Sequence, residues 1–205
     1  AHEINTPVAS IKSNNEITKK IIAQIKDADI CELLQEINEI DTEAIARINR
    51  LVVSLRKFVR LDEAELQEAD INKEIDLIRH ETKNRIEIIK NYSKLPPIKC
   101  YPNMLNQVFM NILVNATHAI KEKGTITIDT NYKNNNLLVK IKDTGCGIKE
   151  PDKIFFAGYT TKGVGVGTGL GLAISQKIIE KHNGKITVKT KLNEGSEFTI
   201  TIPSK

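Results

Sequence analysis

Two regions of the chain space their apolar residues differently, and the change falls near residue 62. In the first region, positions at alternating steps of four and three are almost all apolar from residue 30 onward: Ile30, Leu34, Ile37, Asp41, Ala44, Ile48, Leu51, Leu55 and Phe58. An earlier series obeys the same rule: Ile4, Val8, Ile11, Asn15, Thr18, Ile22 and Ile25. This heptad spacing predicts two amphipathic helices. The break at 26–29 predicts that they form an antiparallel hairpin.

A hairpin with one apolar stripe on each helix cannot bury both stripes well by itself. A second copy would complete a four-helix bundle, so we expect a homodimer. The alternative is that the hairpin packs on the rest of the chain. Residues 1–62, which form this first predicted domain, contain no glycine and only one proline, Pro7.

From residue 66 to 205 the pattern mixes helical and strand periods, which predicts a second domain. Helices are expected over 71–79, 102–121 and 169–182, the first with Asp70 as its N-cap. Strands are expected over 86–89, 125–131, 137–142, 185–191 and 197–202, with polar turns at 133–136 and 193–195. The predicted class is α+β: a helical hairpin, then an α/β sandwich whose mixed sheet carries helices on one face. We place the linker near 62–66.

Composition narrows the functions open to this chain. The 30 basic and 26 acidic residues among 205 are interleaved, so no nucleic-acid partner is expected. No apolar run approaches the roughly 18 residues of a membrane helix, so no membrane contact is expected within these residues. Cys31, Cys100 and Cys146 are widely spaced, which favours a reducing, cytoplasmic setting over disulfides or a zinc site.

Glycine placement indicates a nucleotide site. Eight of the 11 glycines fall within 145–171, although neither a Walker loop nor a dinucleotide fingerprint is present. Asp143 ends a predicted strand and is followed by Gly145 and Gly147. Such a carboxylate can accept a hydrogen bond from an exocyclic amine, and the glycines let a flat base approach the backbone. The segment 167–172 opens a predicted helix, where free N–H groups suit phosphates.

The segment 151–166 lies between these two glycine motifs. It contains Phe155, Phe156, Tyr159 and Lys162, and five glycines alternate from 163 to 171. We expect the two phenylalanines to anchor a loop that moves as a lid.

Two amides on the predicted helix 102–121 add a metal-binding possibility. Asn111 and Asn115 are four residues apart and share a helix face. Their oxygens are hard ligands suited to Mg²⁺, although interhelical hydrogen bonds would also explain them. His118, one turn further, is placed at the nucleotide pocket, whereas His80 and His182 are expected at the surface.

Five motifs, in this order, resemble the transmitter region of a bacterial sensor histidine kinase. They are an H box at 2–7, an N box at 111–119, a glycine box at 143–148, an aromatic lid box at 154–162 and a second glycine box at 167–172. The resemblance covers essentially the whole chain. Tyr159 stands where the family more often has Phe. Because the family's first helix usually extends upstream of the histidine, we expect the chain to begin inside that helix.

The resemblance implies a dimerisation and phosphotransfer hairpin followed by a Bergerat-type ATP-binding domain, as in gyrase, Hsp90 and MutL. It implies that His2 accepts a phosphoryl group from ATP and passes it to an aspartate of a response regulator. It also implies that Glu3 holds the imidazole, that Asp143 recognises the adenine amino group and that Asn115 holds Mg²⁺. The phosphates would lie next to Asn111 and would meet Lys162 and the backbone from Gly165 to Gly171, which includes Gly167, Thr168, Gly169 and Leu170.

The residues around the histidine agree with this chemistry. A neutral imidazole is a competent nucleophile, and a carboxylate on one ring nitrogen stabilises the charge formed when the other attacks. His2 lies outside the Ile4 and Val8 series and is expected to face solvent. Glu3 and Thr6 fit a Glu-x-x-Thr pattern that implies a phosphatase activity toward the regulator.

Two other functions remain open from the sequence. The ATP-binding domain could phosphorylate a protein serine, as anti-sigma kinases do, which would leave the hairpin and His2 without a role. Alternatively, the chain could be a degenerate kinase that serves as a dimeric scaffold. The intact Asn115, Asp143 and glycine run argue against the scaffold.

Overall fold

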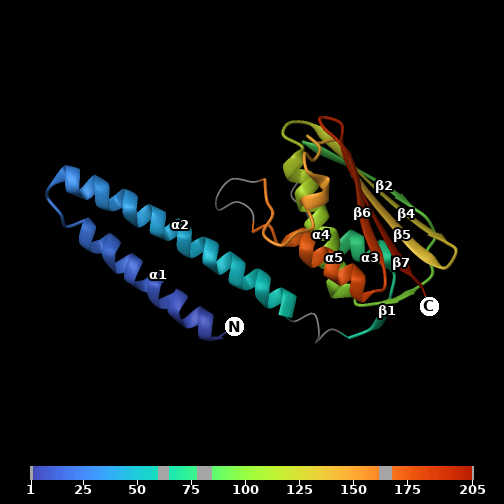
Figure 1. The fold of residues 1–205 in the computed structure, drawn as a ribbon, viewed down its shortest axis with the longest axis horizontal. Helices are drawn as coiled ribbons and strands as arrows, with labels where there is room; N and C mark the ends of the chain where they lie inside the picture. The colour runs from blue at the N-terminus through green and yellow to red at the C-terminus, as the bar shows by residue number, and fades with distance from the viewer. Residues whose placement is uncertain (1, 60–64, 78–84, 162–167, 205) are drawn as a thin grey trace. The chain divides into compact units, whose positions relative to one another are not determined.

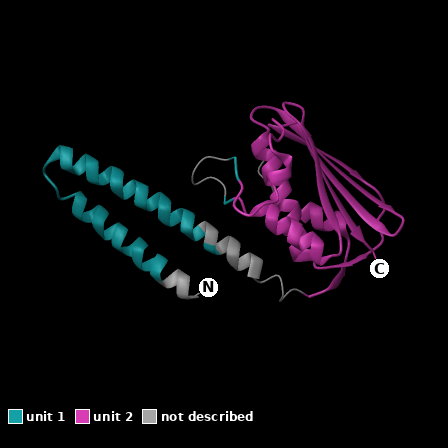
Figure 2. Cartoon of the chain, viewed as in Figure 1, with its two compact units in different colours: residues 1–60, 160–168 teal, residues 61–159, 169–205 magenta. Residues whose placement is uncertain are grey.

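The computed structural model describes residues 2–59, 65–77, 85–161 and 168–204 (Figure 1). It divides into two compact units, one of residues 1–60 with 160–168 and the other of residues 61–159 with 169–205 (Figure 2). The linker expected at 62–66 falls largely outside the described residues.

The first unit is a pair of helices, α1 (His2–Ile22) and α2 (Ala28–Val59). Both predicted helices are therefore confirmed, and Pro7 lies inside α1. The segment between them helps to start α2, because the Asp27 carboxylate accepts a hydrogen bond from the N–H of Ile30 at 3.1 Å.

On α1 the buried positions belong to the predicted heptad seam, whereas on α2 they lie beside it. The buried positions are spaced by seven and are Val8 and Ile22 on α1 with Asn38, Ile45 and Val52 on α2. The seam residues Ile30, Ile37 and Ile48 keep exposed fractions of 50%, 48% and 40%. The hairpin therefore closes on the predicted seam of α1 and on a stripe of α2 that lies beside its seam, and it leaves Ile30, Ile37 and Ile48 on the surface.

A polar network lies at the middle of the helix pair. The Asn38 amide donates to Oδ1 of Asn15 at 2.6 Å and to its carbonyl at 3.0 Å. The Asn15 amide donates to Oγ1 of Thr42 at 2.7 Å, and that hydroxyl donates to the Asn38 carbonyl at 2.8 Å. Buried Asn38 is thus satisfied, as a buried amide must be.

The second unit contains a five-stranded sheet in the order β2-β4-β5-β7-β6. Its strands are β2 (Ile86–Tyr92), β4 (Gly124–Lys133), β5 (Asn136–Asp143), β6 (Lys185–Lys191) and β7 (Gly195–Pro203). Only β2 and β4 pair in parallel, so the predicted mixed sheet is confirmed. The β4–β5 turn places Asn134 and Asn135 at φ of 52° and 57°, as a two-residue hairpin turn requires.

Two further strands escaped prediction. β1 (Gln67–Ala69) and β3 (Ile98–Cys100) pair antiparallel, away from the main sheet. Each has three residues, which is too short to show a period of two.

The helices of the second unit are α3 (Ile71–Leu77), α4 (Pro102–Ala119) and α5 (Gly171–Lys181), with a short 3₁₀ turn, η2, at Pro151–Lys153. They lie on one face of the sheet, as predicted (Figure 1). Asp70 caps α3, since its carboxylate accepts the N–H of Asn72 at 3.1 Å. No helix among the described residues has an apolar stretch long enough to span a bilayer.

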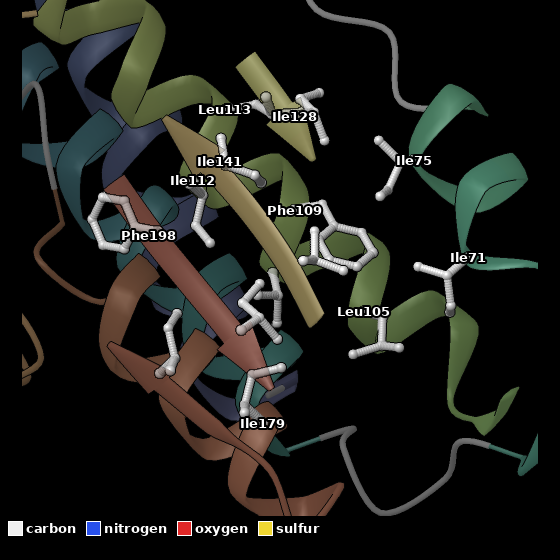
Figure 3. Packing of buried hydrophobic residues seen from close by; sticks show 14 of the residues in the cluster. Ile71, Ile75, Leu105, Phe109, Ile112, Leu113, Ile128, Ile141, Ile179 and Phe198 are labelled. Atoms are coloured by element: carbon white, nitrogen blue, oxygen red, sulfur yellow. The ribbon is translucent and has the colours of Figure 1, made fainter. Parts of the chain in front are cut away.

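The core of this unit lies between the helices and the sheet. Phe109 and its helical neighbours on α4 face Ile128 of β4, Ile141 of β5 and Phe198 of β7 (Figure 3). Phe109 and Ile128 are fully buried. Burial on this scale is worth about 1.5–3 kcal/mol for each large side chain. This packing fixes α4 and the end of β5, which carry the predicted site residues Asn111, Asn115, His118 and Asp143.

His182, at the C-terminal end of α5, is buried, so its predicted surface position is wrong. Its Nδ1 lies 2.7 Å from the Ile178 carbonyl, and its Nε2 accepts the backbone N–H of Tyr101 at 3.0 Å. A histidine with both ring nitrogens satisfied by backbone can be buried in its neutral form. The sequence pattern could not reveal Tyr101, which is distant along the chain. His80 lies outside the described residues.

Candidate functional site

Asp143 is the last residue of β5, and its side chain is turned back toward the loop that follows. Its exposed fraction is 3%, and its carboxylate accepts the N–H of Gly145 at 2.8 Å and the N–H of Ser196. Burial raises the pKa of Asp143, and the two N–H donors oppose that rise. The loop thereby holds one carboxyl group rigidly at the end of the strand.

The C-terminal end of α4 supports this loop. The N–H of Cys146 donates to the Ala119 carbonyl at 3.1 Å. A Cβ on Gly145 would lie 2.6 Å from Cβ of Ala119, so only glycine fits there. Gly147 similarly stands against the Lys191 carbonyl of β6. The segment Asp143–Gly147 is therefore enclosed by α4 on one side and by β6 on the other.

Asn111, near the middle of α4, contacts the start of α5. Its amide nitrogen donates to the Gly171 carbonyl at 2.9 Å and to Oγ of Ser175 at 3.1 Å. Because a carbonyl can only accept, the nitrogen is the atom that bonds to Gly171, and Oδ1 is left as an acceptor. The amide is thus an interhelical bond and also presents an oxygen acceptor.

Asn115 and His118 follow on the same helix, between Asn111 and Ala119. Asn115 is half-buried and His118 is exposed. The eight residue steps from Asn111 to Ala119 span about 12 Å of helix. One edge of α4 therefore joins the Asp143 loop at one end to the start of α5 at the other. The amide oxygens on this edge form a hard donor set that fits Mg²⁺ together with phosphate oxygens.

Two glycines, Gly158 and Gly169, make a close backbone contact at the second glycine box, which we call the glycine neck. The N–H of Gly158 donates to the Gly169 carbonyl at 3.0 Å. Gly169 has φ of 66°, and a Cβ there would overlap the Gly158 backbone. Leu170 is the N-cap of α5, and its side chain makes no capping hydrogen bond. The Leu170 side chain therefore does not compete with a ligand for the first-turn N–H groups, a geometry suited to anions.

The lid box is anchored differently from the prediction. Phe155 packs against the core, but Phe156 keeps an exposed fraction of 66%, so only one of the two phenylalanines is an anchor. The Tyr159 hydroxyl instead donates to the Glu150 carboxylate at 2.9 Å. Of the predicted phosphate contacts, Lys162, Gly165 and Gly167 lie outside the described residues.

The remaining predicted residues divide between the two units. His2, Glu3 and Thr6 lie in the first turns of α1. Thr168 belongs to the first unit, whereas Gly169 and Gly171 belong to the second with Asn111, Asn115, His118 and Asp143. The structure thus brings the base-reading, amide and glycine residues together, and places the predicted phosphoacceptor on a separate unit.

Sequence reasoning missed three hydroxyl residues of the site. Ser175 bridges Asn111 to the Gly171 carbonyl, and Ser196 pairs with Asp143 across β5 and β7. Thr190 of β6 receives the N–H of Ile148 at 2.9 Å. Each contact joins segments that are far apart in sequence. In the sequence itself, each of these residues is marked only as a polar residue at a core-facing position of a strand or helix.

Comparison with known proteins places this site in a family. Residues 100–205 match the family described as histidine kinase-, DNA gyrase B-, and HSP90-like ATPase. The signal transduction histidine-protein kinase AtoS of Escherichia coli (strain K12) is 34% identical over 212 residues, which cover 99% of this chain and 33% of that protein. The sensor histidine kinase ZraS of Salmonella typhi is also 34% identical and is covered over 44% of its length. The chain thus spans less than half the length of these relatives.

A solved structure matches the second unit. The catalytic domain of histidine kinase ThkA is 30% identical, with a TM-score of 0.59 over 68% of this chain and 96% of that chain. The amides of α4, the Asp143 loop and the glycine neck therefore lie within a fold of known ATPases. The chain belongs to the histidine kinase-, DNA gyrase B- and HSP90-like ATPases, and among them to the transmitter regions of two-component histidine kinases.

Proposed function

We propose that this chain autophosphorylates His2 with ATP and passes the phosphoryl group to an aspartate of a response regulator. One observation carries the nucleotide site: a single edge of α4 contacts the Asp143 loop through Ala119 and the start of α5 through Asn111. A carboxylate for a base and N–H groups for phosphates therefore lie at the two ends of one helical edge.

The two ends of ATP are bound by different kinds of group. Asp143 accepts a hydrogen bond from the adenine amino group, and the backbone of Gly145 and Gly147 leaves room for the flat ring. The phosphates meet Asn111 and the N–H groups of the α5 start, with Thr168, Gly169, Leu170 and Gly171. Lys162, Gly165 and Gly167 complete the phosphate contacts, and His118 lines the pocket near Asn115.

Magnesium fits the donor set of α4. Asn115 is the residue that we assign to the ion, in company with the phosphate oxygens. When bound, Mg²⁺ neutralises charge on the phosphates as the terminal group is transferred.

The phosphoryl transfer itself is a displacement at the γ-phosphorus. A ring nitrogen of His2 attacks, an N–P bond forms, and the P–O bond to the leaving ADP breaks. Glu3 holds the other ring nitrogen, stabilises the positive imidazole and takes its proton. The protein's contribution is mainly orientation and charge neutralisation. For this the ATP-binding unit must approach the hairpin, with the linker at 62–66 acting as the hinge.

A homodimer and a receiver domain are the proposed partners, and the cytoplasm is the proposed location. The exposed seam of α2, with Ile30, Ile37 and Ile48, supports a four-helix bundle made from two hairpins. A receiver domain would accept the phosphoryl group from His2. No nucleic-acid role is proposed.

The test is incubation of the dimeric protein with γ-labelled ATP and Mg²⁺. We expect labelling that is acid-labile, absent in His2→Gln and reduced roughly 10- to 100-fold in Asp143→Asn, which removes a buried charged acceptor. Asp129→Asn, on the half-exposed face of β4, is the matched control and should label normally.

The outcomes separate the competing functions. Acid-stable label that persists in His2→Gln would replace this function with a serine kinase. If the wild-type chain does not bind ATP with Mg²⁺, a dimeric scaffold would be the remaining function.

A second activity, dephosphorylation of the regulator, is proposed for Thr6. Thr6 follows Glu3 by three residues and His2 by four in α1, which is the spacing of the Glu-x-x-Thr pattern. The Thr6 hydroxyl would orient a water at the regulator's phosphoaspartate. Thr6→Ala should keep autophosphorylation and slow regulator dephosphorylation, and an unchanged dephosphorylation rate would remove this activity.

A further inference from the structure

The turn between β6 and β7 lies against the Asp143 loop, and the contact is unusually close. Gly195, which opens β7, has φ of 99°, and a Cβ there would overlap the Asp143 carbonyl oxygen. The N–H of Asn193 in the same turn donates to the Cys146 carbonyl at 2.9 Å. The backbone of the turn therefore supports the backbone of the loop, with no side chain between them at Gly195.

One side chain, Thr190 of β6, connects these two segments. Its hydroxyl oxygen accepts the N–H of Ile148 at 2.9 Å and donates to the Gly195 carbonyl at 3.0 Å. The same oxygen lies 3.0 Å from Oγ of Ser196. A hydroxyl has one proton, and Thr190 donates it to the Gly195 carbonyl. Ser196 must therefore be the donor in its hydrogen bond with Thr190.

The network continues to the carboxylate. Ser196 is buried, and its backbone N–H is one of the two donors that hold the Asp143 side chain. The other donor, Gly145, belongs to the loop whose far end, Ile148, is tied to Thr190. Thr190 thus connects the two backbone segments that hold the Asp143 carboxylate.

We propose that Thr190 is a positioning residue for nucleotide binding, acting through the Asp143 loop without touching the nucleotide. Its hydroxyl fixes the separation between the loop that follows Asp143 and the β6–β7 turn. This inference rests on the proposed role of Asp143 in binding ATP. It predicts that loss of the hydroxyl lets the loop move and weakens ATP binding even in a folded protein.

The test compares Thr190→Val, which keeps the shape but removes the hydroxyl, with Thr190→Ser, which keeps the hydroxyl. ATP binding with Mg²⁺ is measured on the whole chain by isothermal titration calorimetry. We expect the dissociation constant to rise roughly three- to tenfold in Thr190→Val, the worth of about one net hydrogen bond, and to stay within about twofold of wild type in Thr190→Ser. Thr187→Val, at an exposed position of the same strand, is the control and should bind normally.

A second measurement separates positioning from general stability. Amide hydrogen exchange of the nucleotide-free protein should quicken at Ile148 in Thr190→Val, with the exchange of the buried strands β4 and β5 unchanged. Faster exchange across the whole second unit would indicate a structural role and overturn the proposal. If Thr190→Val does not fold, Thr190→Ala against Thr190→Ser gives the same comparison.

The outcomes distinguish this inference from the function on which it rests. ATP binding by wild type together with unchanged binding by the hydroxyl-free variant overturns the role of Thr190 alone. Failure of wild type to bind ATP overturns the proposed function, and this inference with it.

Discussion

At the scale of single residues, His182 shows how burial makes a histidine sensitive to pH. Its Nδ1 carries the proton toward the Ile178 carbonyl, and its Nε2 accepts the Tyr101 N–H. Burial, and then the charge of Lys181, lower the pKa of His182, although the Ile178 hydrogen bond opposes them. A second proton on Nε2 would break the bond that joins the end of α5 to the start of α4.

The pH dependence follows from this shift. Because the folded pKa of His182 lies below the unfolded value of about 6.5, the unfolded chain binds more protons, and stability falls as pH is lowered through that value. We expect His182→Gln to flatten the slope of unfolding free energy between about pH 7.5 and 5.5, by at most about 1.4 kcal/mol per pH unit. Urea unfolding followed by circular dichroism measures this slope. An equal slope in His182→Gln would contradict the assignment.

The glycine neck offers a matched pair of substitutions. Gly158 and Gly169 both have positive φ, but a Cβ on Gly158 would meet nothing within 4 Å, whereas one on Gly169 would overlap the Gly158 backbone. Gly158→Ala should therefore cost only the backbone penalty of about 1–2 kcal/mol. Gly169→Ala should cost at least about 1 kcal/mol more, because the neck must open as well. Urea unfolding of the two variants tests the order, and equal costs would show that the neck is loose.

At the scale of elements, Asn15 and Asn38 specify how α1 pairs with α2. Their amides bond to each other and to Thr42, so a slip of one helix along the other would leave buried amides unpaired. In a double-mutant cycle we expect Asn15→Ala and Asn38→Ala to be coupled by about 1 kcal/mol or more. Thermal unfolding of the single and double variants, followed by helical circular dichroism, gives the coupling. Strictly additive losses would mean that the network does not act as a unit.

The elements also show where sequence reasoning succeeds. Long periodic segments such as α2 and β5, and signals such as Asp70 or the paired asparagines of the β4–β5 turn, are local, and the predicted helices and strands formed there. The buried Val8 and Ile22 of α1 belong to the predicted seam, but the stripe that α2 buries was not predictable in the same way. It depends on which of two neighbouring heptad stripes meets the partner helix, and polar Asn38 occupies a buried position of that stripe.

The candidate site divides along the same line. Asp143, Asn111 and the glycines could be found from the sequence because each motif is contiguous. Ser175, Thr190 and Ser196 could not, because their importance comes from hydrogen bonds to segments that only the fold brings near. Leu170 illustrates a third case, in which the pattern marked the start of α5 and the structure shows that the N-cap side chain makes no capping bond.

At the scale of the whole molecule, the unburied seam of α2 makes the hairpin incomplete alone. A charge at Ile37 or Ile48 would be buried without a partner in a bundle of two hairpins, so Ile37→Lys and Ile48→Lys should convert a dimer to monomer. Glu36→Lys, on an exposed polar position of the same helix, should remain dimeric. Sedimentation equilibrium measures the change, and calorimetry should find ATP binding unchanged within about twofold, because Asp143, Asn111 and Asn115 lie in the second unit. A monomeric wild type, or a lysine variant that stays dimeric, would mean that the seam has another occupant, and the hairpin packing on the rest of the chain would then explain its apolar stripe.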